Sequence, residues 1–220
     1  MSHSDSPVPR RGFMGRAAAT VLAFAAAPRL VASEALQAQQ AGQDGWLDGL
    51  RASHRNLFDF PNFAGGLPAV HMLNYLNTYN TAYGVPDGDI NVVGTFYGGT
   101  TLLAANDAMW AKYRLGELLN ETDPEGRPWT RNPWRAVVNA EGLALPEASI
   151  EALQRRGVLF IACNNALTFF YDLIAQARQL DAATVGADIR ANLLPGVIVV
   201  PAMVIAIEKA QARGLAYNRQ

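Results

Sequence analysis

The sequence is poor in the side chains that most often carry chemistry in proteins. Its 220 residues include one cysteine and three histidines, and these do not have the spacing of a zinc site. It also lacks the glycine-rich dinucleotide motif, the P-loop and the serine nucleophile elbow. These absences leave a dehydrogenase, a P-loop nucleotide hydrolase, a serine hydrolase and a metalloenzyme without support. We therefore expect no metal and no cofactor, and whether the protein is an enzyme stays open.

An excess of charge of one sign is missing as well. The chain has 18 basic and 19 acidic residues, a formal net charge of −1, and no run of basic side chains. Proteins that bind nucleic acid usually carry a basic patch or stripe, so we expect no nucleic-acid partner. Half of the residues are hydrophobic and 17% are charged, which is typical of an ordinary globular domain.

The N-terminal part contains no apolar run long enough to span a bilayer, which takes about 20 residues. An alanine-rich apolar run over residues 17–27 follows the pair Arg10–Arg11. Paired arginines before a short apolar run are typical of a twin-arginine export signal. We predict that residues 1–35 are this signal, cleaved after its small-x-small ending, and that the mature protein is periplasmic without a membrane attachment. An uncleaved basic N-terminal anchor is the alternative.

The rest of the chain alternates between short β-branched or aromatic runs and segments with helical periodicity. Residues 36–53 are rich in Gln, Ala and Gly and are expected to form a mobile linker or a loosely docked helix, and residues 54–220 the folded domain. Strands are expected over 56–60, 90–99, 158–162, 196–200 and 215–219; helices over 67–83, 101–119, 145–156, 164–176, 182–192 and 201–213; and an irregular excursion over 120–134.

This alternation predicts an α/β fold. Strands separated by helices form βαβ units, whose parallel sheet is covered by helices on both faces. We expect a single three-layer α/β/α sandwich with a mostly parallel sheet of about five strands. In such a sheet, ligands bind beyond the carboxyl ends of the strands.

The only cysteine lies at one of these strand ends. The apolar run 158–162 leads into Cys163, and Asn164 and Asn165 then open a helix. A helix N-terminus favours a thiolate over a thiol, and the thiolate is the nucleophile. We expect Cys163 to be partly accessible with its sulfur facing that helix, and either asparagine to cap the helix or to bind the sulfur. The alternative is an inert, buried thiol.

A second candidate is the loop Tyr97-Gly98-Gly99-Thr100, which follows the strand expected over residues 90–99. Its backbone N–H groups are suited to a nest that binds an anion at the start of the next helix. A tight turn without a ligand explains the two glycines equally simply. Both readings place the loop beside Cys163, at the same edge of the sheet.

Three asparagines, Asn74, Asn77 and Asn80, recur on one helix at intervals of three residues. Asparagine is a mediocre helix former, so this amide stripe points to an interface or to a buried polar network. We expect a homo-oligomer.

Two segments resemble a known family. The block "GVLFIACNNAL", residues 157–167, is similar to the strand–cysteine–helix segment of the DsrE/DsrF-like proteins, which include the TusD-type sulfur carriers. The tail "LLPGVIVVPAMVIAIEKAQARGLAYNRQ", residues 193–220, is similar to the last strand, helix and edge strand of the same proteins. The resemblance covers roughly residues 54–220, whereas the leader and the 120–134 excursion distinguish this chain from the small cytoplasmic carriers.

The resemblance implies a DsrE-like fold in an exported branch of the family. It implies that Cys163 carries sulfur as a persulfide, that a sulfur-donor or sulfur-acceptor protein is a partner, and that the chain forms oligomers. The alternative function is a non-catalytic oligomeric module that binds a small ligand at the strand ends of Tyr97 and Cys163.

The export signal gives the first testable prediction. Replacing both Arg10 and Arg11 by lysine should trap the full-length precursor in the cytoplasm, because the translocase reads the arginine pair. Cell fractionation and immunoblotting measure the distribution, and an unchanged periplasmic yield would contradict the assignment.

Overall fold

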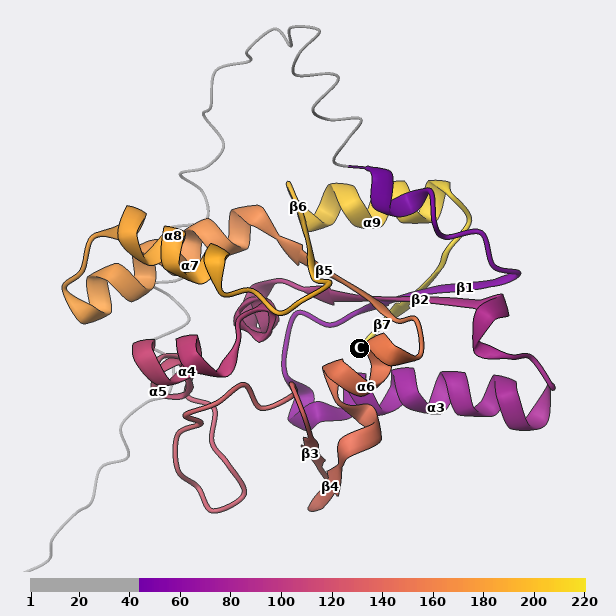
Figure 1. Ribbon diagram of the computed structural model, residues 1–220, viewed down its shortest axis with the longest axis horizontal. Helices are drawn as coiled ribbons and strands as arrows, with labels where there is room; N and C mark the ends of the chain where they lie inside the picture. Colours follow the sequence, from indigo (N-terminus) through magenta and orange to yellow (C-terminus); the bar gives the residue numbers. More distant parts are fainter. Residues whose placement is uncertain (1–43) are drawn as a thin grey trace, which may run out of the picture. The chain divides into compact units, whose positions relative to one another are not determined.

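The fold is described for residues 44–220 of a computed structural model (Figure 1). The predicted export signal and the first part of the predicted linker lie outside these residues. Within them, no helix is long and apolar enough to cross a membrane.

A five-stranded sheet forms the centre of the domain. Its order is β6-β5-β2-β1-β7, and every neighbouring pair is parallel. The two outer strands are therefore β6 and β7, as expected for the closing edge strand predicted over 215–219. The strands are β1 (His54–Asp59), β2 (Ile90–Phe96), β5 (Leu159–Cys163), β6 (Ile198–Val200) and β7 (Ala216–Arg219).

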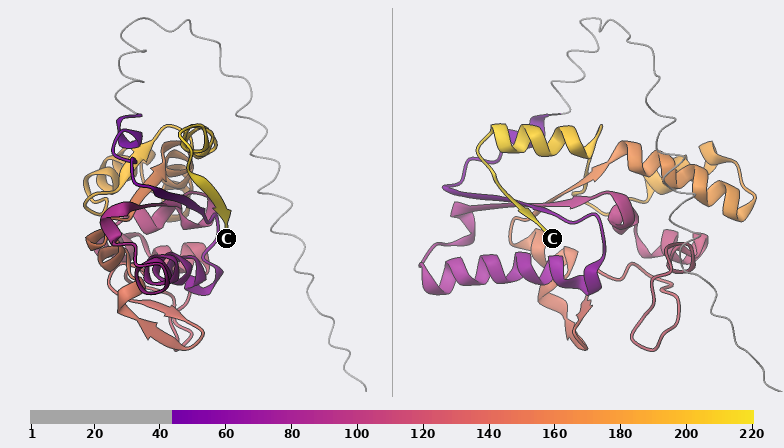
Figure 2. Two further views of the ribbon diagram at one scale, coloured as in Figure 1. Left: turned by 90° about the vertical axis from the view of Figure 1, so that its right-hand side faces the viewer. Right: turned by 180° about the vertical axis from the view of Figure 1, so that it is seen from behind.

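Helices cover both faces of this sheet, which confirms the predicted three-layer α/β/α sandwich (Figures 1 and 2). One face packs against α9 (Met203–Ala212) and the 3-10 helix Gly45–Leu47. The other carries the larger core, to which α3 (Leu67–Ala82), α6 (Ile150–Arg155), α7 (Asn164–Arg178) and α8 (Ala182–Ala191) contribute.

The folded domain begins earlier than predicted. Trp46, Leu47 and Leu50 are buried in the same apolar cluster as α9. This part of the expected linker is therefore docked, because its three large apolar side chains cover the sheet face that α9 alone leaves open. Two ion pairs, Lys209–Asp44 and Arg213–Asp48, join it to α9.

The single helix expected over residues 101–119 is wrong. A 3-10 helix (Gly98–Ala104) is followed by two short helices, α4 (Asp107–Tyr113) and α5 (Leu115–Leu119). Asn106 is extended and caps α4 by accepting a hydrogen bond from the Met109 N–H at 3.1 Å. Arg114, at φ 51°, is left-handed and separates α4 from α5. The apolar periodicity continued across both breaks, so it did not reveal them.

The segment expected as one helix over 145–156 also differs. Pro146 opens a 3-10 turn (Pro146–Ala148), and α6 begins afterwards, with the Ser149 hydroxyl accepting from the Ala152 N–H at 3.2 Å. Before it lies an antiparallel hairpin that the sequence analysis missed, formed by β3 (Val138–Ala140) and β4 (Leu143–Leu145). Its two turn residues both have positive φ, as in a type I′ turn.

The asparagine stripe serves the fold of this chain. The Arg156 guanidinium donates to Asn77 Oδ1 at 2.6 Å, to Asn80 Oδ1 at 2.7 Å and to the Asp87 carboxylate at 2.8 Å. The Arg156 interaction lowers the pKa of Asp87. Two of the three amides therefore bind within the chain and lend no support to self-association, which stays a prediction.

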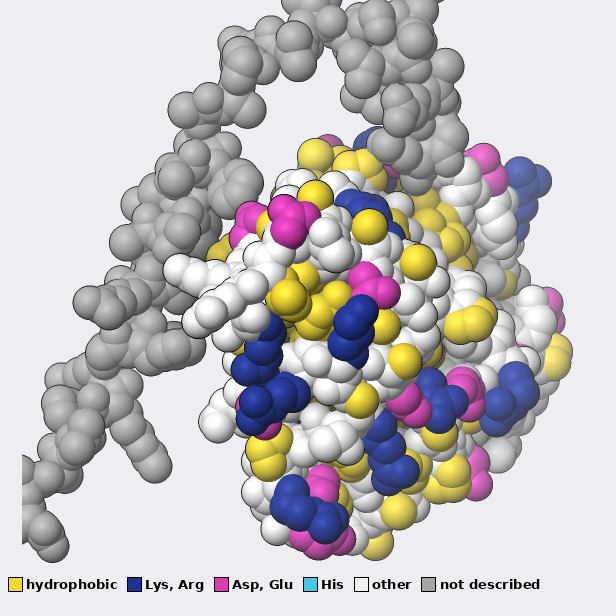
Figure 3. Space-filling model, turned by 60° about the vertical axis from the view of Figure 1, so that its left-hand side comes forward, with side chains coloured by type: hydrophobic (Ala, Val, Ile, Leu, Met, Phe, Trp, Pro, Cys, Tyr) yellow, Lys and Arg dark blue, Asp and Glu magenta, His cyan; other side chains and the backbone are white. Residues whose placement is uncertain are grey.

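Charged side chains of both signs are interspersed on the face seen in Figure 3. Lys112–Asp188 at 2.7 Å and Arg135–Asp107 at 2.8 Å are two ion pairs of residues 44–220. Exposed pairs of this kind contribute little stability.

Gly116 in α5 fixes the irregular excursion over residues 120–134 to the core. A Cβ atom at this position would lie 2.3 Å from the Trp129 carbonyl oxygen and 2.4 Å from its nitrogen. Next to this close contact between Gly116 and Trp129, the Glu121 N–H donates a hydrogen bond to the Gly116 backbone oxygen at 2.8 Å. Only glycine permits this contact.

Gly116→Ala should therefore destabilise the protein by about 2 kcal/mol, since overpacking opposes the gain that alanine normally gives a helix. Denaturant unfolding measures the change. Gly88→Ala is the matched control, because nothing lies within 4 Å of a Cβ there. Equal stability of the two variants would contradict the close packing of Trp129.

Candidate functional site

Cys163 is the last residue of β5, an inner strand of the sheet, as the sequence predicted. Alternate residues of β5 face opposite layers, and Leu159, Ile161 and Cys163 all face the cluster beneath α9. The thiol therefore lies at the carboxyl edge of the sheet, on its α9 face.

Two details of the predicted thiol environment are wrong. The sulfur faces the first turn of α9, not the helix that follows it in sequence, and the Met203 N–H donates to Cys163 Sγ at 3.4 Å. The residue is also buried, with 6% of its surface exposed, where partial access was expected. Strand alternation is the reason for the first difference, because α7 packs on the opposite face of the sheet.

The two asparagines after the cysteine do not support the sulfur. Cys163 itself occupies the N-cap position of α7, and Asn164 and Asn165 are the first two helical residues. Asn164 Oδ1 accepts a hydrogen bond from the Arg190 guanidinium, and Asn165 is exposed. Neither asparagine is the side-chain cap that the sequence suggested.

The Tyr97–Thr100 loop is a tight turn that joins two strand ends. The Gly99 N–H donates to the Pro61 oxygen at 2.7 Å, and the Thr100 hydroxyl donates to the Phe60 oxygen at 2.8 Å. Gly98 has φ 58°, and a Cβ there would lie 3.0 Å from the Pro61 oxygen. The loop thus uses its glycines and the Gly99 N–H group for contacts within the chain. Of the two interpretations of the sequence, an anion-binding nest and a tight turn, the tight turn describes the loop.

Sequence reasoning missed a buried carboxylate on the same face of the sheet. Asp59 ends β1 with 1% of its surface exposed. Its Oδ2 atom accepts from the Tyr217 hydroxyl at 2.5 Å and from the Arg219 guanidinium at 3.1 Å, and its Oδ1 atom from the Thr95 hydroxyl at 3.4 Å. Burying an unpaired carboxylate costs several kcal/mol, so these donors are needed to hold it there.

The carboxylate changes the acidity of the tyrosines around it. Burial, followed by the interaction with Asp59, raises the pKa of Tyr97. The hydrogen bond to Asp59 is the main cause that raises the pKa of Tyr217. Negative charge next to a phenol disfavours its ionised form, so both tyrosines stay protonated to higher pH than free tyrosine.

Asp59 and Cys163 belong to one row along the sheet edge. Phe96 pairs with Ala162 in the β2–β5 register, so the next residues, Tyr97 and Cys163, are neighbours across the two strands. Tyr97 packs against the same apolar cluster as Cys163 and interacts with Asp59. The row places the Cys163 sulfur beside the protonated phenol of Tyr97. Residues 44–220 contain no group of three His, Cys, Asp or Glu side chains that could hold a metal ion.

One signal in the sequence could have revealed Asp59. It is the single acidic residue inside the run Leu57–Phe60, at an odd-numbered position that shares its strand face with Leu57. Tyr217 and Arg219 gave no such signal, because their role depends on β7 pairing with β1 across most of the chain.

Comparison with known proteins adds one structure. No model of a protein family matches the sequence, and no curated protein matches it. A solved structure described as "Structure of Protein of Unknown Function MTH1491 from Methanobacterium thermoautotrophicum" is similar at 20% sequence identity and a TM-score of 0.38. The match covers 76% of this chain and 100% of that one. The strand order and the layers of this chain define its fold without reference to that structure.

Asp59→Asn should lower stability by about 2 kcal/mol, because the amide puts donors against Arg219 in place of an acceptor. It should also move the pKa of Tyr217 down towards that of free tyrosine. A tyrosine whose pKa is raised by folding stabilises the folded state fully below its unfolded-state pKa, which is near 10. This stabilisation is lost as pH rises through the folded-state pKa. The wild type should therefore lose stability more steeply than the variant above about pH 10.

Denaturant unfolding across the alkaline range and spectrophotometric tyrosinate titration measure these effects. Asp48→Asn is the control, since it removes a carboxylate whose side chain is 63% exposed in a surface pair with Arg213. Equal behaviour of the two variants would show that the Asp59 network is without effect.

Proposed function

We propose that the protein is a periplasmic, DsrE-like sulfur carrier that holds sulfane sulfur as a persulfide on Cys163. The observation that carries this proposal is the hydrogen bond from the Met203 N–H to Cys163 Sγ. Met203 is the first residue of α9, so its N–H has no acceptor within the helix and is free to bind an anion. The resemblance of residues 157–167 and 193–220 to the DsrE/DsrF-like proteins supports the same assignment.

The chemistry needs only the thiolate and a polysulfide or a persulfidated partner protein. The thiolate attacks the terminal sulfur of the donor, a new S–S bond forms on Cys163, and the donor's S–S bond breaks. The electron pair of the broken bond leaves with the shortened donor as an anion, so charge and electrons balance. Transfer onward repeats the step with an acceptor thiolate.

The positive end of α9 is suited to both anions of this cycle. A thiolate and a persulfide anion are each stabilised by a helix N-terminus and by backbone N–H donors. Tyr97 lies beside Cys163 on the neighbouring strand. Because its phenol stays protonated, it does not repel a negatively charged sulfur. Asp59, one strand further away, is already paired with Tyr217 and Arg219.

Burial of Cys163 means that sulfur exchange needs a local opening. The side chains of Val200 and Met203, each 1% exposed, pack in the same cluster as the thiol. The reaction is therefore expected to run at a rate set by how often this edge opens, as for other buried sites with a low opening free energy.

The same burial is the observation that favours the second candidate, a non-catalytic module that binds a small ligand. In that case Cys163 is a small apolar core residue. Self-association is part of both proposals, and sedimentation at micromolar concentration tests it independently of the sulfur chemistry.

The deciding experiment uses intact-protein mass spectrometry after incubation of the native, mature protein with inorganic polysulfide. We expect a mass increase of one sulfur atom, because the chain has a single cysteine, and its loss on reduction. Cys163→Ser is the control and should remain unmodified. A wild-type protein that gains sulfur only after denaturation would assign Cys163 to the core and favour the binding module.

A further inference from the structure

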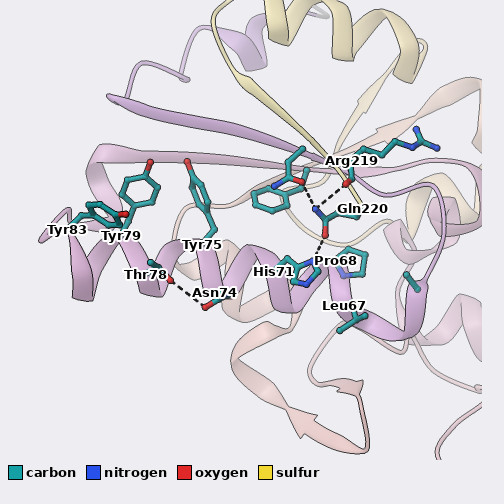
Figure 4. Close-up of a pocket in the computed structure, with 13 residues that line it drawn as sticks. Leu67, Pro68, His71, Asn74, Tyr75, Thr78, Tyr79, Tyr83, Arg219 and Gln220 are labelled. Carbon is teal, nitrogen blue, oxygen red and sulfur yellow. Dashed lines mark hydrogen bonds between the residues drawn. The ribbon is translucent and has the colours of Figure 1, made fainter.

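A cavity lies on the other face of the sheet, away from Cys163. It is an open groove of about 700 Å³ between α3 and the strands β1 and β7. Figure 4 shows α3 as its floor and the C-terminal strand as its upper wall. The sulfur chemistry does not use this groove, and of the side chains that donate to Asp59 only Arg219 lines it.

Three tyrosines line the groove in a row, Tyr75 and Tyr79 within α3 and Tyr83 at its C-cap. Tyr75, Tyr79 and Tyr83 are four residues apart, and their ring centroids are separated by 4.9 Å and 5.5 Å. At a rise of 1.5 Å per residue the row extends over about 12 Å. Tyr83, at its outer end, is 71% exposed. A row of this length is suited to an elongated ligand with more than one ring.

The remaining polar side chains of the groove are three amides, a hydroxyl and an imidazole. They are Asn74, Asn218, Gln220, Thr78 and His71. Arg219 also lines the groove, but its guanidinium is bound to Asp59 and points away from α3 (Figure 4). Amides and hydroxyls, which both donate and accept, match the hydroxyl groups of a ligand better than its carboxylates, phosphates or amines.

A buried acceptor next to the tyrosines is left unsatisfied. Asn56 is 7% exposed, and its Oδ1 atom has no hydrogen-bond partner among residues 44–220. It lies on β1 between His54 and Phe58, whose rings contact Tyr79 at 4.4 Å and Tyr75 at 5.6 Å. Asn56 therefore faces α3 between these tyrosines. Buried polar atoms without a partner are rare. Asn56 does not itself line the groove, so a ligand contacts the tyrosines in front of it and not this amide.

We propose that this groove binds a neutral oligosaccharide. The apolar C–H face of each sugar ring packs on a tyrosine ring, while its hydroxyls pair with the amides and the imidazole. The combination of an aromatic floor with a few convergent polar groups is the usual composition of a small-molecule site. The ligand would lie along α3, between the tyrosine rings and the side chains of Asn218 and Gln220.

The proposal is tested by NMR titration of the ¹⁵N-labelled protein with maltotriose, cellotriose and N,N′-diacetylchitobiose. We expect at least one of them to bind and to shift the backbone amides of Tyr75, Tyr79 and Asn218. Removing one aromatic contact should weaken this binding, so Tyr83→Ala should raise Kd about 3- to 10-fold. Tyr83→Phe keeps the ring and should change Kd by less than about 2-fold.

Two controls separate the groove from the rest of the molecule. Phe169→Ala removes an aromatic side chain that is 40% exposed on α7 and should leave Kd unchanged. Cys163→Ser should bind the sugar like the wild type, so failure of the sulfur proposal and failure of this one are distinguishable. The inference is overturned by an absence of shifts at roughly 10 mM sugar, by shifts confined to the carboxyl edge, or by tighter binding of charged glucosamine or digalacturonate.

Discussion

Hydrogen bonds to the buried carboxylate of Asp59 hold β7 in place, and both the sheet edge at Cys163 and the tyrosine groove depend on them. Asp59 ends the strand next to the edge of the sheet, and three hydroxyl or guanidinium donors from β2 and β7 compensate its charge. A separate main-chain hydrogen bond runs from the Gln220 N–H to the backbone carbonyl oxygen of Asp59 at 2.8 Å. Because a short edge strand of four residues pairs along one side only, these contacts decide where the end of the chain lies.

Successive side chains of β7 then point to opposite faces of the sheet, so the position of this strand affects both faces. Tyr217 and Arg219 point to the α9 side, where they bind Asp59 and leave Tyr97 beside Cys163. Asn218 and Gln220 point to the α3 side, where they form the upper wall of the tyrosine groove, and Gln220 binds His71. A change at Asp59 would therefore be felt in the sulfur row and in the groove, although the two share no side chain.

Local patterns in the sequence predicted most of the fold and little of the site. The five strands and the long helices were predicted because apolar periodicity acts within a few residues. Gly84, with φ 67° after α3, and Asp181, whose side chain caps α8, act over the same short range. The breaks at Arg114 and at the start of α6 were missed because they depend on partners elsewhere, Trp129 for Gly116 and the Trp134 oxygen for the Ile150 N–H. The same limit hid Asp59, whose donors are 36 to 160 residues away.

The environment of Cys163 depends on its position in the alternation of β5, because a shift by one residue moves a side chain to the other face of the sheet. The side chain at position 162 points to the core beneath α7, whereas the side chain at position 163 points to α9. The first turn of α9 exposes Val204 and Ile205 to solvent, and it buries Met203, whose N–H binds the sulfur. A reagent therefore reaches the buried thiol only when this turn moves away from the edge of the sheet.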